Sequence, residues 1–170
     1  MTLNHDVIFA FYKPYDIFTR SEFIANTVKQ FGFQLATIID DTSVISPSSI
    51  INKGCYIAPN VVIDADSQVG FNCIILFQSV VSREVNLGNN IFVSAGCVFK
   101  GSVSICENNF ISAKTVITKD INAECFVNAG LVLNKKIEKS SIIGVRNDLV
   151  IVDLPEDRSS AQKKLRFFHP

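Results

Sequence analysis

Tryptophan is absent from this chain of 170 residues, methionine occurs once and histidine only twice. Because His5 and His169 both lie near a terminus, a zinc hydratase site with three histidine ligands has no basis in the sequence, and we expect no metal. Neither charge is in excess, with 16 basic and 16 acidic residues, so there is no sign of a nucleic-acid-binding surface. No apolar run approaches the roughly 20 residues that a membrane span needs.

Signals for export are also missing. The first residues have neither the basic start nor the small-residue cleavage site of a signal peptide, so we expect a cytoplasmic protein. The five cysteines are an odd number without a CxxC pair and should be free thiols there. Cys55 and Cys73, 18 positions apart, are expected to stack in the core rather than to bind a metal or form a disulfide.

What the chain does have is a six-residue repeat. An aliphatic residue, or once a phenylalanine, occupies every sixth position fourteen times in succession. A period of six is that of a β-helix, in which three hexapeptides form a triangular coil and each coil advances by about 4.8 Å. These positions should point inward: Ile39, Ile45, Ile51, Ile57, Ile63, Val69, Ile75, Val81, Leu87, Val93, Phe99, Ile105, Ile111 and Ile117. The positions four residues further on, from Ser43 to Ile121, should point inward as well.

The repeat divides the chain into three parts. Residues 1–38 are expected to form a small β-α-β cap, with strands over residues 7–11 and 33–39 and a helix that Ser21 caps and Gly32 ends. Residues 39–137 form the β-helix, with an interruption of the spacing over residues 122–137. Residues 138–170 are expected to contain strands near 142–145 and 149–154, then a basic tail that is solvated, caps the last coil or reaches a neighbour.

Several stretches of the repeat resemble the left-handed β-helix acyltransferases. Within that superfamily the chain is similar to the bacterial sugar O- and N-acetyltransferases that act on sialic acid or on UDP-linked amino sugars. The resemblance covers roughly residues 33–133 and rests on residues 33–39, 44–49, 79–81, 87–88, 93–96, 101–103, 110–113 and 115–121. It implies an all-β fold, a left-handed parallel β-helix of hexapeptide repeats.

The resemblance also implies a function. Members of the family are homotrimers with three clefts between subunits, in which acetyl-CoA lies with its pantetheine arm bonded to main-chain groups of adjacent coils. A histidine with an acidic neighbour serves as general base toward an acceptor amine or hydroxyl. The family's CoA-contacting positions correspond here to Gly96, Gly101, Ala113 and Lys114, where Lys114 replaces a small residue.

The sequence departs from the family at the base itself. The histidine–acid pair falls on Arg83 and Glu84, and arginine stays protonated and cannot accept a proton. A lysine that helps the family to hold CoA is not matched in residues 128–132, although Lys135 and Lys136 are near. The glycine-rich loop that opens the family's nucleotide-sugar domain is not matched either.

Two functions therefore remain open. The protein is expected to transfer an acyl group, most simply acetyl, from CoA to an amino or hydroxyl group of a sugar or nucleotide sugar in surface glycan biosynthesis. In that case Arg83 binds a substrate anion or polarises the thioester, and Glu84 or a water takes the proton. The alternative is a catalytically silent trimer that serves as a binding or scaffolding subunit, with Arg83 paired to Glu84 or Glu107 only for structure.

Overall fold

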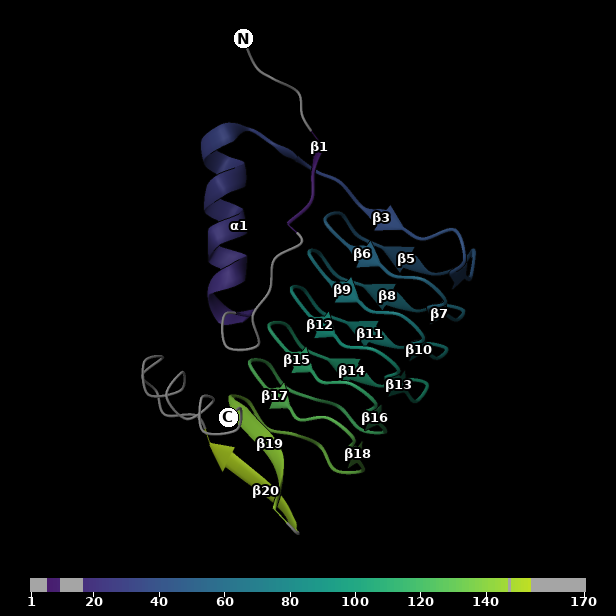
Figure 1. Ribbon diagram of the computed structural model, residues 1–170, viewed down its shortest axis with the longest axis vertical. Helices are drawn as coiled ribbons and strands as arrows, with labels where there is room; N and C mark the ends of the chain where they lie inside the picture. The colour runs from purple at the N-terminus through teal and green to yellow at the C-terminus, as the bar shows by residue number, and fades with distance from the viewer. Residues whose placement is uncertain (1–5, 10–16, 147, 154–170) are drawn as a thin grey trace.

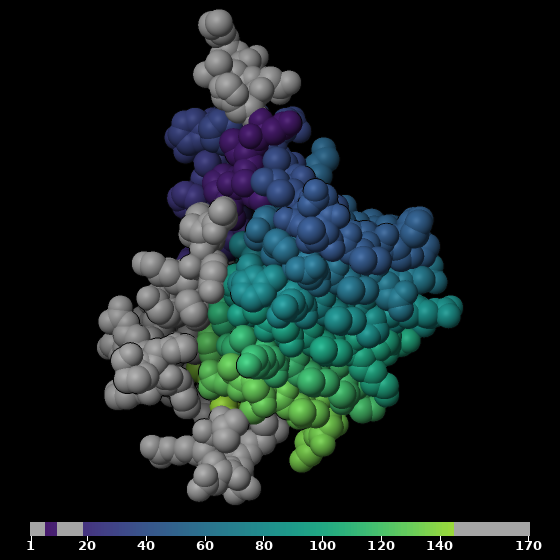
Figure 2. Space-filling view, turned by 45° about the vertical axis from the view of Figure 1, so that its right-hand side comes forward, coloured from purple at the N-terminus to yellow at the C-terminus, as the bar shows by residue number. Residues whose placement is uncertain are grey.

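The protein is an all-β parallel solenoid with a single helix among the residues that the structure describes, which are 6–9, 17–146 and 148–153. The computed structural model shows six triangular coils, consistent with the left-handed β-helix that the sequence predicts (Figure 1). The coils comprise residues 38–55, 56–73, 74–91, 92–109, 110–125 and 126–141, and we number them 1 to 6. In Figure 2 the colour changes steadily along the solenoid axis, as expected for coils stacked in chain order.

Each coil contributes one short strand to each of three parallel faces. Face 1 contains β3 (Ile38–Ile39), β6 (Tyr56–Ile57), β9 (Ile74–Ile75), β12 (Phe92–Val93), β15 (Phe110–Ile111), β17 (Phe126–Val127) and β19 (Ser141–Arg146). Face 2 contains β4 (Val44–Ile45), β7 (Val62–Ile63), β10 (Val80–Val81), β13 (Val98–Phe99), β16 (Val116–Ile117) and β18 (Val132–Leu133). Face 3 contains β5 (Ile50–Ile51), β8 (Gln68–Val69), β11 (Asn86–Leu87) and β14 (Ser104–Ile105), followed by isolated bridges at Ile121 and Ile137.

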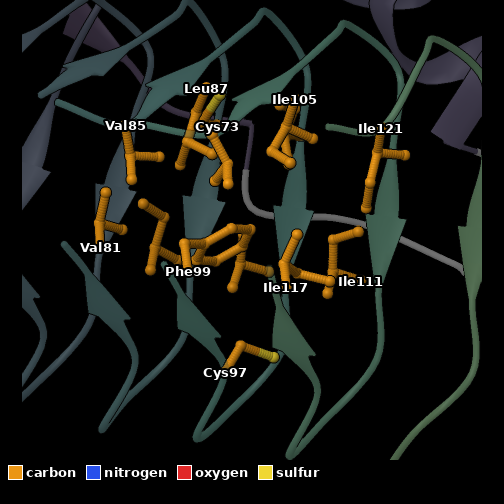
Figure 3. Close-up of a cluster of buried hydrophobic side chains, with 14 of the residues drawn as sticks. Cys73, Val81, Val85, Leu87, Cys97, Phe99, Ile105, Ile111, Ile117 and Ile121 are labelled. Atoms are coloured by element: carbon orange, nitrogen blue, oxygen red, sulfur yellow. The ribbon is translucent and has the colours of Figure 1, made fainter. Parts of the chain in front are cut away.

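The six-residue repeat builds the core as predicted. The second residue of each two-residue strand points inward, and from coil 2 onward these side chains are buried (Figure 3). Neighbours in the core are 18 positions apart, as where Val81 pairs with Ile63 and Phe99. In coil 1 the stacking has no layer above it, so Ile39 remains 43% exposed.

The last coils are shorter, and Ile121 points inward there as predicted, but from a different position in its hexapeptide. Ile121 was expected four residues after a strand, but it bridges Ile105 and Ile137 and so occupies the strand position of face 3. In Figure 3, Leu87, Ile105 and Ile121 lie in one row. The turn between faces 2 and 3 has therefore lost two residues, before Ile121 and again before Ile137, and the interruption begins earlier than residue 122.

The corners explain the placement of asparagine and glycine. Backbone φ is positive at Gly54, Asn60, Asn72, Asn90 and Asn108, which tolerate this conformation better than most residues. At Gly70 and Gly88 the reason for glycine is a different one, because neither residue has positive φ. A Cβ on Gly70 would lie 2.5 Å from the carbonyl carbon of Gly88, so close approach of the coils requires glycine there.

The N-terminal unit is a β-α-β element, with β1 (Asp6–Val7) parallel to β2 (Gln34–Leu35) and α1 (Ile17–Phe31) between them. The helix ends before Gly32 as predicted, but it begins at Ile17, so Ser21 lies inside it and is not its N-cap. Both predicted strands are shorter than expected, and residues 10 and 11 lie outside the described part.

Helix α1 is fixed against the side of the solenoid, alongside the face 1 strands (Figure 1). Its buried Arg20 donates hydrogen bonds to the Asn72 carbonyl oxygen and to Asn90 Oδ1, both at 2.7 Å, and to the Phe9 carbonyl oxygen at 2.9 Å. At the other end, β19 and β20 (Asp148–Asp153) form an antiparallel hairpin, which confirms the two predicted strands. The basic tail lies outside the described residues.

The outer surfaces of the three faces differ. Face 1 presents a stack of Phe92, Phe110 and Phe126, which is buried. Face 3 presents mostly polar, exposed side chains, among them Gln68 and Asn86. Face 2 presents only valines, which are half-buried in the middle coils and exposed at both ends: Val44, Val62, Val80, Val98, Val116 and Val132.

Candidate functional site

Arg83 and Glu84 lie together at the corner between faces 2 and 3, the 2/3 corner, in coil 3. Both side chains are exposed, and Arg83 Nε lies 3.1 Å from Glu84 Oε1 and 4.0 Å from Asp66 Oδ2 in the coil above. Ser102 in the coil below donates a hydrogen bond to the other carboxylate oxygen, Glu84 Oε2, at 2.9 Å. Glu84 has a φ of 60°, a left-handed conformation that turns its side chain out of the corner.

Gly101 lies directly below Arg83 at the same corner. A Cβ at residue 101 would lie 3.0 Å from the Arg83 carbonyl oxygen, so a larger residue would push the two coils apart. The backbone N–H groups of Arg83 and Gly101 donate to no acceptor within the described residues. The corner thus combines a guanidinium, a carboxylate oriented from both sides, and two available amides.

The other candidate residues lie at the corner between faces 1 and 2, the 1/2 corner. Here Ala95, Ala113 and Ala129 follow one another in coils 4, 5 and 6, as the hydrogen bonds from Lys114 N to Ala95 O and from Gly130 N to Ala113 O show. The N–H groups of these three alanines have no acceptor in the described chain. They form a ladder of donors about 4.8 Å apart along the solenoid axis. We call this row of three alanines the alanine shelf.

Small residues keep the shelf open. A Cβ on Gly96 would meet only the Lys114 side chain, at 3.7 Å, and one on Gly130 would meet nothing within 4 Å. Lys114 is exposed and has a φ of 56°. Phe92 and Phe99 would obstruct a ligand on the shelf if their side chains pointed toward it. Both are buried instead, Phe99 in the core and Phe92 on face 1.

The structure therefore brings the predicted residues together in two groups rather than one. Arg83, Glu84 and Gly101 share the 2/3 corner, while Gly96, Ala113 and Lys114 share the 1/2 corner. Within one chain the valine-covered face 2 lies between the two groups. A site that uses both groups needs two copies of the chain.

Some relevant residues did not stand out in the sequence. Asp66 and Ser102 flank Glu84 because they are 18 positions before and after it, a relation that the repeat itself predicts once the corners are known. Phe77 stands out at the 1/2 corner, one coil above Ala95, with half of its side chain exposed. In the sequence, the signal for this position of Phe77 was that it precedes Ala95 by 18 residues, the length of one coil.

The described residues also bear on metal ions and membranes. They contain no cluster of three or more histidine, cysteine, aspartate or glutamate side chains placed to hold a metal ion. Helix α1, the single helix of the described part, is not long and apolar enough to cross a membrane. His5 and His169 lie outside the described residues.

Comparison with known proteins supports a relation to sugar acetyltransferases. Three structures of perosamine N-acetyltransferase (PerB) from Caulobacter crescentus, in complex with CoA and GDP-perosamine, match 81% of this chain with 25% to 26% identity and TM-scores of 0.71 to 0.72. The match covers 66% to 67% of those chains, so this chain spans about two thirds of their length. The sequence matches no family model and no curated protein sequence.

Two further structures share the fold. The acetyltransferase domain of PglB from Neisseria gonorrhoeae FA1090, in complex with acetyl coenzyme A, is 20% identical, with a TM-score of 0.74 over 86% of this chain and 70% of that chain. WeeI from Acinetobacter baumannii AYE is 18% identical, with a TM-score of 0.79 over 89% of this chain and 73% of that chain. The chain is thus similar in fold to sugar acetyltransferases of the hexapeptide, left-handed β-helix family.

Proposed function

We propose that the protein transfers an acyl group, most simply acetyl, from CoA to an amino or hydroxyl group of a sugar or nucleotide sugar in surface glycan biosynthesis. The observation that carries this proposal is the alanine shelf, with its three available N–H groups in successive coils. A pantetheine arm has two amide carbonyls along a thin chain. Donors at strand spacing beside residues without bulky side chains match such a ligand.

A homotrimer would complete the site. If face 2 of each subunit faces a threefold axis, the valines bury one another there, which removes a continuous apolar stripe from water. The 2/3 corner of one subunit then meets the 1/2 corner of the next. The charged group at Arg83 and the alanine shelf, which a single chain holds apart, would line one cleft.

The chemistry at the 2/3 corner has to proceed without histidine. The acceptor nitrogen or oxygen attacks the thioester carbonyl carbon, the carbon–sulfur bond breaks, and CoA leaves as the thiolate. Glu84 or a water would take the proton from the acceptor, while the permanently charged Arg83 would polarise the thioester oxygen or hold an anionic substrate group. Orientation of the two reactants in the cleft would supply most of the acceleration.

The ion pairs of Arg83 favour a second candidate, a catalytically silent trimer that binds another molecule or protein. Because Arg83 already contacts Asp66 and Glu84, its role at the corner is explained without any substrate. The two candidates differ in whether CoA binds.

Titration calorimetry with acetyl-CoA tests the proposal. We expect one site per chain and a Kd between micromolar and sub-millimolar, followed by turnover in a screen of amino sugars. Arg83→Ala should lower kcat/KM roughly 100-fold, as loss of a transition-state donor does, while leaving the melting temperature unchanged. Lys139→Ala is a matched control, because Lys139 also forms an exposed corner ion pair, with Glu124, but outside the cleft.

The opposite outcomes are equally clear. Absence of binding at millimolar acetyl-CoA would favour the silent trimer. An Arg83→Ala protein with normal kinetics and a lower melting temperature would make Arg83 a structural residue. Restoring the family's base with Arg83→His should raise the rate if the rest of the site is intact.

A further inference from the structure

Phe77 closes the upper end of the alanine shelf. Gly96 N donates to Phe77 O at 3.0 Å, which places Phe77 one coil above Ala95 in the same column of the 1/2 corner. Below it the column contains only Ala95, Ala113 and Ala129. Phe77 is therefore the largest side chain of the column, and it is 50% exposed.

The charge distribution along the solenoid sets the direction in which CoA would lie. Coils 1 and 2 contain four acidic residues and one basic residue: Asp40, Asp41, Asp64, Asp66 and Lys53. Coil 6 has Lys135 and Lys136 at the 2/3 corner and no acidic residue at that corner. The phosphates of CoA are attracted to coil 6 and repelled from coils 1 and 2, so the thioester end points toward coil 3.

Coil 3 is also the level at which the acceptor group lies. Arg83, Glu84 and Phe77 all belong to coil 3, the first two at the 2/3 corner and Phe77 at the 1/2 corner. When parallel subunits are related by a threefold axis along the solenoid, equal coils face each other across the cleft. Phe77 of one subunit then faces Arg83 of the next, and the acyl carbon has to react just below these two residues, at the Ala95 end of the step from Ala95 to Phe77.

We infer that Phe77 limits the length of the acyl group, so that acetyl is accepted and longer acyl chains are rejected. This inference rests on the proposed function. A chain that extends from the thioester along the shelf, away from the phosphates, meets the Phe77 ring within one coil spacing, about 4.8 Å above Ala95. An acetyl methyl group ends before the ring, whereas a butyryl or hexanoyl chain does not.

The test compares acetyl-, butyryl- and hexanoyl-CoA as donors for the full-length protein. For Phe77→Ala we expect the ratio of kcat/KM for hexanoyl-CoA to that for acetyl-CoA to rise by roughly tenfold or more, since each accommodated methylene gives at least about that factor. Phe77→Leu should give a smaller rise. Phe71→Ala is the matched control. Phe71 lies in coil 2, next to coil 3, and is 45% exposed, but it is at the corner between faces 3 and 1.

Calorimetry of the same thioesters separates the inference from the function on which it rests. If the wild-type protein binds no CoA thioester, the proposed function fails and the inference with it. If acetyl-CoA binds and reacts but Phe77→Ala keeps the wild-type ratio, or Phe71→Ala changes it equally, only the inference is overturned. A tighter Kd for hexanoyl-CoA in Phe77→Ala but not in Phe71→Ala supports it independently of turnover.

Discussion

Small polar side chains at the inward corner positions bind the coils to one another. Cys125 Sγ donates to the Glu138 carbonyl oxygen at 3.1 Å, and Cys97 Sγ donates to that of Ser112 at the same distance. The hydroxyl groups of Ser67 and Ser79 donate equivalent hydrogen bonds to the carbonyl oxygens of Ser82 and Ser94, 15 positions further along the chain. A thiol and a hydroxyl thus have the same role in this core, which explains why cysteines are frequent yet unpaired.

These buried thiols predict a loss of stability in alkali. Burial raises the pKa of Cys125 from 9.0 to about 11, so the folded state keeps a proton that the unfolded state gives up. The stabilising effect is complete below pH 9 and is lost as the pH rises toward 11. At pH 10 this residue alone should lower the free energy of unfolding by about 1.4 kcal/mol, which urea unfolding at pH 8 and pH 10 measures.

Two substitutions serve as controls for this pH effect. Cys125→Ala should be less stable than wild type at pH 8 but should lose less stability between pH 8 and pH 10. Ser67→Ala removes a buried hydroxyl that makes the equivalent hydrogen bond but cannot titrate, so it should lower stability by the same amount at pH 8 and pH 10. Equal pH dependence in Cys125→Ala and wild type would contradict the assignment.

At the residue scale, the sequence predicted the core well, whereas its site residues remain predictions. A period of six identifies inward positions because each hexapeptide repeats one local geometry. The resemblance to the acyltransferases, not the period, pointed to Arg83 and Glu84. The sequence did not show which face each corner joins, so the contacts of Asp66 and Ser102 with this pair were not predicted.

Elements whose ends depend on tertiary packing were predicted less well. Ser21 has the chemistry of an N-cap, yet α1 begins four residues earlier, because packing of Arg20 and Ile24 against the solenoid decides where the helix lies. In the sequence, Ile121 lies four residues after Ile117 and so would be the second inward residue of that hexapeptide. Its true register became clear only from its pairing with Ile105 in the coil above.

The attachment of α1 depends on Arg20. Arg20→Met should remove three hydrogen bonds to groups that stay buried or partly buried, and we expect a loss of about 3 kcal/mol in the free energy of unfolding. Urea unfolding measures the loss, and hydrogen exchange should become faster in α1 than in the coils. Lys29→Met, an exposed change in the last turn of the same helix, should alter neither quantity.

Asn109 makes the first shortened coil possible. Its buried side chain donates to the carbonyl oxygens of Cys106 and Asn122, at 2.7 and 2.9 Å, and accepts from Cys125 N at 2.7 Å. Asn109→Ala leaves all three groups without this partner, so the free energy of unfolding should fall by about 3 kcal/mol. Urea unfolding measures this loss, with Asn134→Ala, a change at an exposed residue, as the control. A loss no larger than that of the control would show that water replaces the side chain.

At the scale of the whole molecule, each face has a separate use. Helix α1 occupies the side along face 1, and face 3 is polar, so the valine stripe of face 2 is the apolar surface that the proposed trimer would bury. The candidate residues lie at the two edges of this face. The β-helix could be predicted from the period, and its left-handed sense only from the resemblance, whereas the division of the candidate residues between two corners requires the order of faces around the coil.

Val98→Glu tests whether face 2 forms the trimer and completes the site. The change places a charge in the middle of the valine stripe, where a trimer would bury three carboxylates beside one another, and such burial is not compatible with tight association. We expect sedimentation velocity to show a trimer for the wild type and a folded monomer for Val98→Glu. Asn86→Glu, the same charge on the neighbouring polar face 3, should remain a trimer.

Because Val98 belongs to neither corner group, the monomer should also lose acetyl-CoA binding although every candidate site residue is intact. A monomer that still binds acetyl-CoA would place the whole cofactor site within one chain, and a Val98→Glu protein that is still trimeric would place the interface on another face.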